Sequence, residues 1–287
     1  MPTTPRLLVT GGSGYLGRHL TVKTTEIYNV YTTYHGHPNQ IVTGQSLPLD
    51  LTDRAAVLKL VAEVRPQAII HAAAINPGSG DEVLMMAVNA EGSRYVAEAA
   101  VAVGARLVHI STEMVHDGRH APYADDAVPS PLQGYGRSKA AAEANVAAVD
   151  PRAAIVRTSL IYGLDEMDRG TVGFVARLQA GEELLLFTDV IRQPVWRETL
   201  SAALLKLTRL DYSGPLNVVG RQPLSRAEFG RRMLAYWRVE TNDLVGEGRG
   251  ADVSASIPLD LRLTVERGER LLQMPFLGVD EVLALNK

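Results

Sequence analysis

The fold is decided by the stretch Leu7-Leu8-Val9-Thr10-Gly11-Gly12-Ser13-Gly14-Tyr15-Leu16-Gly17. Its apolar start is typical of a buried strand, and the residues after it can continue as a helix. Glycines between a strand and a helix bring backbone N–H groups to a pyrophosphate. Gly11 permits the tight turn, Gly14 the close approach of the ligand, and Gly17 the packing of helix on strand. The stretch predicts a dinucleotide-binding loop in an α/β, doubly wound parallel (Rossmann) sheet, with an ordinary glycine turn as the alternative. Further cofactor contacts are expected from Ser13, Tyr15 and Leu16.

A second strand is expected over residues 27–34, and the residues at its end bear on the choice of cofactor. An NAD enzyme usually places an acid after this strand to hold the adenine ribose. The chain has Thr33, Tyr34 and His35 there instead. Because an acid would repel a 2′-phosphate, its absence favours NADP(H), with NAD(H) as the second choice.

The composition narrows the class of protein further. The net charge is −3 from 29 basic and 32 acidic residues, which gives no general affinity for nucleic acid or an anionic membrane. The sequence has no cysteine, so thiolate chemistry and disulfides are excluded. No apolar run reaches the ~20 residues that span a bilayer, and no signal-peptide pattern is seen. A cytoplasmic protein without a metal site is expected, and a homodimer is left open.

Two further strands are predicted to end at the ligand crevice. Residues 68–74 form an apolar run that closes with the small side chains Ala72, Ala73 and Ala74, against which a cofactor can lie. Residues 106–113 end in the hydroxyl pair Ser111 and Thr112. Ligands of doubly wound sheets bind at the carboxyl ends of the strands. A hydroxyl there can donate a hydrogen bond to a carbonyl oxygen that gains charge, although such a pair alone is more often a turn or a cap.

Tyr135 and Lys139 are four residues apart, ahead of an alanine-rich helical run, and are expected on one helix face. The ammonium is expected to lower the pKa of the phenol and to make it a proton donor or acceptor near neutral pH. The pattern alone is common on solvated helices. Its position after a glycine loop and a hydroxyl pair, in that order, favours catalysis.

Three stretches together resemble the dTDP-4-dehydrorhamnose reductase-like family of the extended short-chain dehydrogenase/reductases: residues 111–118, 131–139 and 156–163. The resemblance implies Thr112, Tyr135 and Lys139 as the catalytic trio, with Ser111 beside it at the cofactor. Tyr135 would donate the proton to a ketone, Lys139 would bind the nicotinamide ribose, and Thr112 would hydrogen-bond the carbonyl oxygen.

The resemblance also implies contacts around this trio. Asp50 and Leu51 would border the adenine ring, although Asp50 can equally begin the helix predicted over 52–64, together with Asp53. Asn89 would support the active-site backbone. The expected substrate contacts are Glu113, Met114, Tyr162 and Trp196.

Some substrate-side positions depart from the family pattern. Met114 and His116 stand where relatives carry aromatic residues, and Leu160 stands where they carry a tryptophan. The catalytic and cofactor residues are therefore expected to be kept, while the substrate surface differs. His116 is a further candidate acid or a structural hydrogen-bonding group.

The C-terminal third is expected to build a second, smaller α/β domain that binds substrate. The predicted cofactor domain comprises residues 1–163, with 190–220 returning to it, and the smaller domain comprises 164–189 and 221–287. A loop over 165–171 is expected to cover the cleft, followed by a helix over 173–180. Arg192, Trp196 and Arg197 are either contacts to an anionic or ring-bearing substrate or structural residues.

The sequence predicts an NAD(P)H-dependent reductase of a small-molecule carbonyl substrate, such as a dTDP-4-keto-sugar or another ketone. One alternative is a sugar-nucleotide epimerase or dehydratase of the same fold. Another is a non-catalytic NADP-binding regulatory subunit, similar to that of methionine adenosyltransferase. A complete set of Thr112, Tyr135 and Lys139 favours an enzyme.

Overall fold

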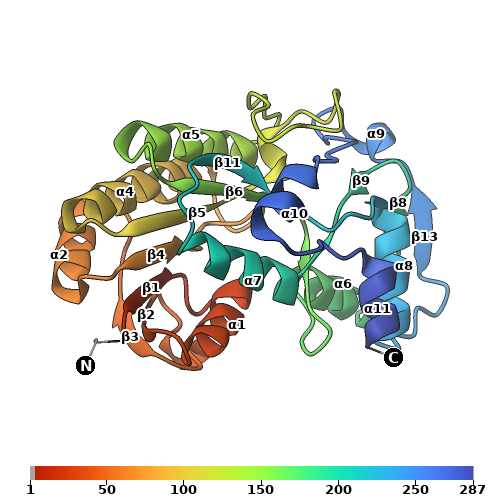
Figure 1. Cartoon of the computed structure of the whole chain (residues 1–287). Helices are drawn as coiled ribbons and strands as arrows, with labels where there is room; N and C mark the ends of the chain where they lie inside the picture. The colour runs from red at the N-terminus through yellow and green to blue at the C-terminus, as the bar shows by residue number, and fades with distance from the viewer. Residues whose placement is uncertain (1–3, 287) are drawn as a thin grey trace.

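A seven-stranded parallel sheet forms the centre of the protein in the computed structural model, which describes residues 4–286. The strand order is β11-β6-β5-β4-β1-β2-β3 (Figure 1). The strands are β1 (Arg6–Thr10), β2 (Asn29–Tyr34), β3 (Gln45–Pro48), β4 (Ala68–His71), β5 (Arg106–Thr112), β6 (Ala154–Thr158) and β11 (Gly214–Asn217). The order reverses between β1 and β4, which is where doubly wound sheets bind their ligands. The predicted fold class is confirmed.

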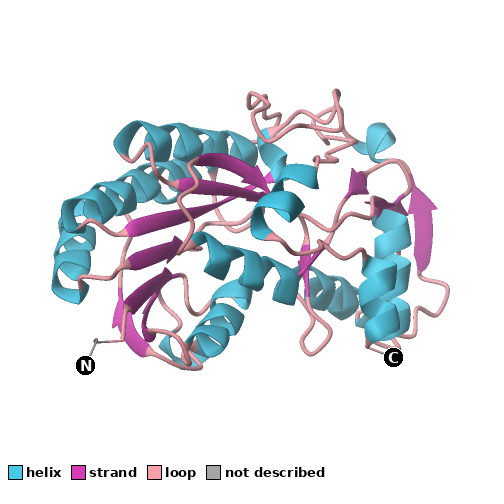
Figure 2. Cartoon of the chain, viewed as in Figure 1, coloured by secondary structure: helices cyan, strands magenta, loops and turns pink. Residues whose placement is uncertain are grey.

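Helices cover both faces of this sheet (Figure 2). One face carries α2 (Arg54–Val64), α4 (Gly92–Val103) and α5 (Gly134–Val149), and the other carries α1 (Tyr15–Thr24), α7 (Arg197–Leu207) and α10 (Glu266–Leu272). Side chains alternate along a strand, so Leu7 and Val9 pack into the core on one face and Leu8 into the core on the other. All three are fully buried.

The remaining elements form a smaller lobe beside the carboxyl ends of the strands, on the right of Figure 1. Its strand pairs are β8 (Leu184–Phe187) with β13 (Val245–Gly248), and β9 (Ile191–Arg192) with β12 (Leu224–Ser225). Its helices are α6 (Arg169–Gln179), α8 (Arg226–Tyr236), α9 (Gly250–Val253) and α11 (Val279–Leu285). A short parallel pair, β7 (Ile161–Tyr162) with β10 (Val195–Trp196), connects it to the sheet.

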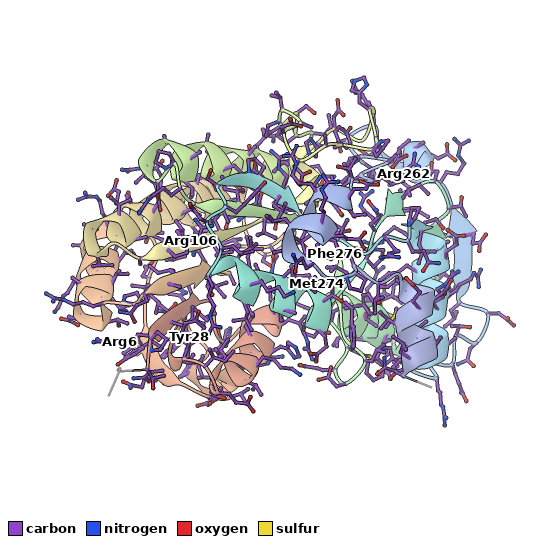
Figure 3. The ribbon with its side chains drawn as sticks, viewed as in Figure 1. Arg6, Tyr28, Arg106, Arg262, Met274 and Phe276 are labelled. Carbon is purple, nitrogen blue, oxygen red and sulfur yellow. The ribbon has the colours of Figure 1, made fainter. Side chains whose placement is uncertain are left out.

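The predicted start of α6 is wrong. α6 begins at Arg169 and not at 173, because the Asp168 carboxylate caps it by accepting the N–H groups of Gly170 and Thr171. The segment after α10 packs against the core of the sheet. Phe276 is fully buried in the core beneath the sheet with α7, and Met274 packs beside it (Figure 3).

The helix that follows β4 has an irregular centre. It runs as α3 (Glu82–Met85), a π-helical turn over Met86–Glu91, and α4. A π-turn widens the helix and often occurs at functional sites. Here it places Asn89 so that its amide bonds the N–H and C=O of Ile75 and the hydroxyl of Ser138.

Among residues 4–286, no helix is both long and apolar enough to cross a membrane. The same residues contain no group of three histidine, aspartate or glutamate side chains arranged to hold a metal ion.

Candidate active site

A cavity of about 890 Å³ lies at the carboxyl ends of the central strands, and the residues predicted from the sequence meet in it. Every predicted cofactor residue lines it: Gly11, Ser13, Gly14, Tyr15, Leu16, Gly17, Thr33, Tyr34, His35, Asp50, Leu51, Ala72, Ala73, Ala74, Ser111, Tyr135 and Lys139. Thr112 lines it as well. The three catalytic candidates and the glycine loop therefore share one cavity.

The glycine loop has the shape of a backbone cradle. Gly11 has a φ of +72°, and a Cβ there would lie 2.8 Å from the backbone of Ala73. A Cβ on Gly17 would lie 2.2 Å from the carbonyl oxygen of Gly11. Gly14 caps α1 without a side chain, so the N–H groups of the first helical turn remain available to an anion. This geometry fits a dinucleotide pyrophosphate.

The two aspartates before α2 have separate roles. Asp53 caps α2 by accepting the N–H of Ala56 at 3.0 Å. Asp50 lines the cavity, and its carboxylate accepts both the N–H and the hydroxyl of Thr52 at 2.8 Å. These hydrogen bonds hold the pKa of Asp50 below its usual value. Asp50 is thus an anion facing the cavity.

This separation gives a matched pair of variants. Asp50→Ala is expected to raise the Kd for NADPH by about tenfold, because an acceptor facing the cofactor is lost. Asp53→Ala is expected to leave that Kd unchanged and to lower the free energy of unfolding by about 1 kcal/mol, because a helix cap is lost. Fluorescence titration and urea denaturation of both variants measure the two effects. Equal effects on cofactor binding would contradict the assignment.

The hydroxyl pair at the end of β5 points in two directions. Ser111 donates its hydroxyl hydrogen to Glu143 at 2.5 Å, behind the cavity wall. Thr112 accepts the N–H of Met114 at 3.2 Å, and its own hydroxyl hydrogen is directed at the phenolic oxygen of Tyr135. Successive side chains alternate along a strand, and this alternation makes Thr112 the donor toward a ligand.

Tyr135 is half-buried at the N-terminus of α5 and lines the cavity. Burial and, to a smaller extent, the Glu113 carboxylate raise the pKa of Tyr135 to about 12, while a hydrogen bond with Thr112 acts in the opposite direction. The expectation that Lys139 lowers this pKa is therefore wrong. A phenol with this pKa is protonated at neutral pH, which is the form that donates a proton.

Lys139 lies one helical turn further along α5 and is only 3% exposed. Its Nζ donates to the carbonyl oxygen of Ile110 at 2.7 Å. Burial lowers the pKa of Lys139 to about 8, and the charge of Glu143 acts in the opposite direction. The ammonium group therefore titrates within an accessible pH range.

A buried ion pair supports this wall of the cavity. Arg157 on β6 is 1% exposed and donates to both carboxylate oxygens of Glu143, at 2.7 Å for the shorter contact. Its other nitrogen donates to the carbonyl oxygens of Asp125 and Ala127. Because Glu143 also accepts from Ser111, this pair joins α5, β5, β6 and the loop before α5.

None of the four predicted substrate residues lines the cavity. Tyr162 is fully buried and packs edge-to-face on Phe229, with ring centroids 5.6 Å apart. Trp196 packs against the same apolar cluster of the smaller lobe. Met114 packs against a separate cluster around Tyr123. For these three, packing within the protein is the better interpretation.

Glu113 does not line the cavity either, but its carboxylate lies close enough to Tyr135 to raise the pKa of the phenol. Its side chain is 3% exposed, with Oε1 3.3 Å from Nε of Arg192. Burial raises the pKa of Glu113 to about 7. Glu113 thus remains a candidate substrate contact next to the catalytic trio.

The other candidates in this region have structural roles. Arg192 donates to the carbonyl oxygens of Ile191 and Pro258. Arg197 pairs with Asp165 and lies over the ring of Tyr15. His116 is buried and stacks on Tyr123 with ring centroids 4.1 Å apart, which removes it as an active-site acid.

The cavity has lining residues that the sequence did not single out: Asn76, Pro77, Gly78, Ser79, Leu84, Val88 and Ser159. Asp168, Arg169 and Gly170 also line it, and they belong to the segment 165–171 that was expected to cover the cleft. Residues 76–79 belong to the loop after β4, so the rule that ligands lie beyond the carboxyl ends of strands would have found them. Leu84 and Val88 belong to the helix containing the π-turn, and no local pattern marks them.

This sheet, its glycine loop and the cavity holding Thr112, Tyr135 and Lys139 define an extended short-chain dehydrogenase/reductase. A family model described as the RmlD substrate binding domain matches residues 5–271, and the chain belongs to that family.

Individual relatives agree with this. A dTDP-4-dehydrorhamnose reductase of Streptomyces griseus is 39% identical over 220 residues, which cover 73% of this chain and 67% of the relative. The crystal structure of dTDP-4-dehydrorhamnose reductase from Bacillus anthracis in complex with NADP superposes with a TM-score of 0.83 at 27% identity, covering 99% of this chain and 98% of that one. Methionine adenosyltransferase 2 subunit beta of Xenopus laevis is 32% identical over 165 residues, which cover 55% of this chain and 47% of the relative.

Proposed function

We propose that this protein is an NADPH-dependent reductase of a sugar-nucleotide ketone such as a dTDP-4-keto-sugar, with Tyr135 as the proton donor. The observation that carries the proposal is that Thr112, Tyr135 and Lys139 line the same cavity as the glycine loop. The relatives named as dTDP-4-dehydrorhamnose reductases supply the substrate class.

The glycine loop would hold the pyrophosphate, and Ala72, Ala73 and Ala74 would leave room for the cofactor along the strand ends. The absence of an acid among Thr33, Tyr34 and His35 supports NADPH, and NADH remains a second cofactor. When bound, the reduced nicotinamide supplies the hydride that forms the new C–H bond.

The side chains of the site stabilise and protonate the oxygen of the reacting carbonyl. As the carbonyl carbon accepts the hydride, the C=O π bond breaks and negative charge develops on the oxygen. Thr112 donates a hydrogen bond to that oxygen, and Tyr135 transfers its phenolic proton to it, which leaves an alcohol. The ammonium of Lys139 would hold the nicotinamide ribose.

The test follows NADPH absorbance with dTDP-4-keto-sugars and a panel of simple ketones. Oxidation of NADPH in step with formation of the sugar alcohol is expected for the dTDP-4-keto-sugars. A dTDP-sugar without the keto group is the matched control and should give none. Turnover with no net change in NADPH would support the epimerase or dehydratase alternative. Failure with every ketone, together with copurification of another enzyme, would support a regulatory subunit.

The pH dependence follows from Lys139. Its pKa of about 8 means that the ammonium is present below pH 8 and is lost above it. The value of kcat/KM is therefore expected to be level near pH 7 and to fall with a slope of one above about pH 8, while Tyr135 stays protonated. A profile that stays level to pH 10 would contradict the role of the ammonium.

A further inference from the structure

Two buried histidines lie beneath Lys139, and the proposed chemistry uses neither ring. His71 on β4 and His109 on β5 are paired in register, with ring centroids 5.3 Å apart. They are 1% and 0% exposed. A buried imidazole needs hydrogen-bonding partners, so the partners of each ring define its role.

The hydrogen positions on His71 follow from its neighbours. Thr10 Oγ1 accepts the N–H groups of Ala72 at 3.2 Å and Ala73 at 3.3 Å, so its hydroxyl hydrogen goes to Nδ1 of His71 at 2.6 Å. The hydrogen of His71 then sits on Nε2 and is donated to Ser93 Oγ at 3.0 Å. Both nitrogens are occupied, and His71 connects β1 to α4.

His109 has a different partner. Its Nε2 lies 3.4 Å from Nζ of Lys139, which also donates to the carbonyl oxygen of Ile110. An ammonium group only donates, so Nε2 is the unprotonated acceptor and the ring hydrogen sits on Nδ1, which has no hydrogen-bond partner among residues 4–286. Burial and the charge of Lys139 hold the pKa of His109 well below its usual value, so the ring stays neutral.

We propose that His109 is a positioning residue for Lys139: its Nε2 and the carbonyl oxygen of Ile110 fix two ammonium hydrogens and direct the third into the cavity. The inference rests on the proposed function, in which that ammonium contacts the cofactor ribose. A lysine head group on a flexible stem can turn about a single hydrogen bond, whereas two acceptors fix its orientation. The acceptor also stabilises the charged form.

Few other groups act on the charge of Lys139. Glu143, one turn further along α5, favours the ammonium, and His71 is neutral because burial and the charge of Lys139 lower its pKa to about 3. Tyr135, one turn earlier, is also neutral. Removing the acceptor on His109 therefore leaves the carbonyl oxygen of Ile110 and the charge of Glu143 to support the ammonium.

The test compares His109→Leu with His109→Gln, whose Oε1 can still accept. We measure the pH dependence of the NADPH Kd by fluorescence, without ketone, and of kcat/KM with the keto-sugar. The leucine variant is expected to shift the alkaline limb of both profiles down by about one pH unit, and the glutamine variant to restore it. His116→Leu removes another buried histidine and should not move the limb.

A measurement on the unmodified protein keeps the inference testable if the leucine variant does not fold. Ring ¹⁵N chemical shifts should show His109 with its hydrogen on Nδ1. The Nε2–H tautomer, or an unshifted limb in His109→Leu, would overturn the inference. The tautomer and the Kd need no ketone. If both agree with the inference while no ketone is reduced, the proposed function fails and the positioning role stands.

Discussion

Tyr135→Phe is expected to lower kcat for the keto-sugar by about 10²- to 10⁴-fold while leaving the Kd for NADPH unchanged. The ring still fills its place in the cavity wall, and only the proton that goes to the carbonyl oxygen is lost. With its pKa raised to about 12, Tyr135 holds that proton through the neutral pH range. Steady-state kinetics at pH 7 and a fluorescence titration of NADPH measure the two quantities.

The matched control is Tyr162→Phe. This change also removes a phenolic hydroxyl from a buried tyrosine, but Tyr162 lies in the apolar core of the smaller lobe. Its hydroxyl is among the buried groups without a hydrogen-bond partner in residues 4–286, so its removal should cost no stability. Full activity in Tyr135→Phe, or an equal loss in both variants, would refute proton donation by Tyr135.

The second large effect concerns the ion pair behind the cavity. Arg157→Leu is expected to lower the free energy of unfolding by about 3–5 kcal/mol, because the carboxylate of Glu143 is left buried without its partner. Replacing both residues by leucine should recover part of this loss, since the carboxylate that had lost its partner is then removed as well. The carbonyl oxygens of Asp125 and Ala127 lose a donor in both variants, so recovery is not expected to be complete.

Urea denaturation of the single and double variants measures these differences. Arg177→Leu is the surface control, since Arg177 is 58% exposed in its pair with Glu182 and its loss should matter far less. A double variant as unstable as Arg157→Leu alone would show that the buried charge is not the cause.

The parts of this site that could be predicted from the sequence are those carried by local patterns at strand ends. Gly11, Gly14 and Gly17 determine a backbone shape by themselves, and the parallel sheet brings the ends of β1, β4 and β5 to one edge. Thr112 and Tyr135 therefore meet in one cavity although they are 23 residues apart.

The environments of individual side chains could not be predicted from the sequence, because they depend on burial by distant segments. Tyr162 has the same side chain as Tyr135, but Phe229 and the other residues of its cluster enclose it. The pKa of Tyr135 rises because burial outweighs neighbouring charge, and burial is a property of the folded chain. The pairing of His109 with Lys139 joins a strand to a helix, and the two residues are 30 positions apart in the sequence.

The central claim is that this cavity carries out a net reduction, and isotope transfer tests it most directly. The protein is incubated with a dTDP-4-keto-sugar and NADPH deuterated at the transferable position of the nicotinamide, and the sugar product is analysed by mass spectrometry. We predict that each reduced sugar carries one deuterium on the former carbonyl carbon, with one NADPH oxidised per product. A product without deuterium, formed with no loss of NADPH, would contradict the claim.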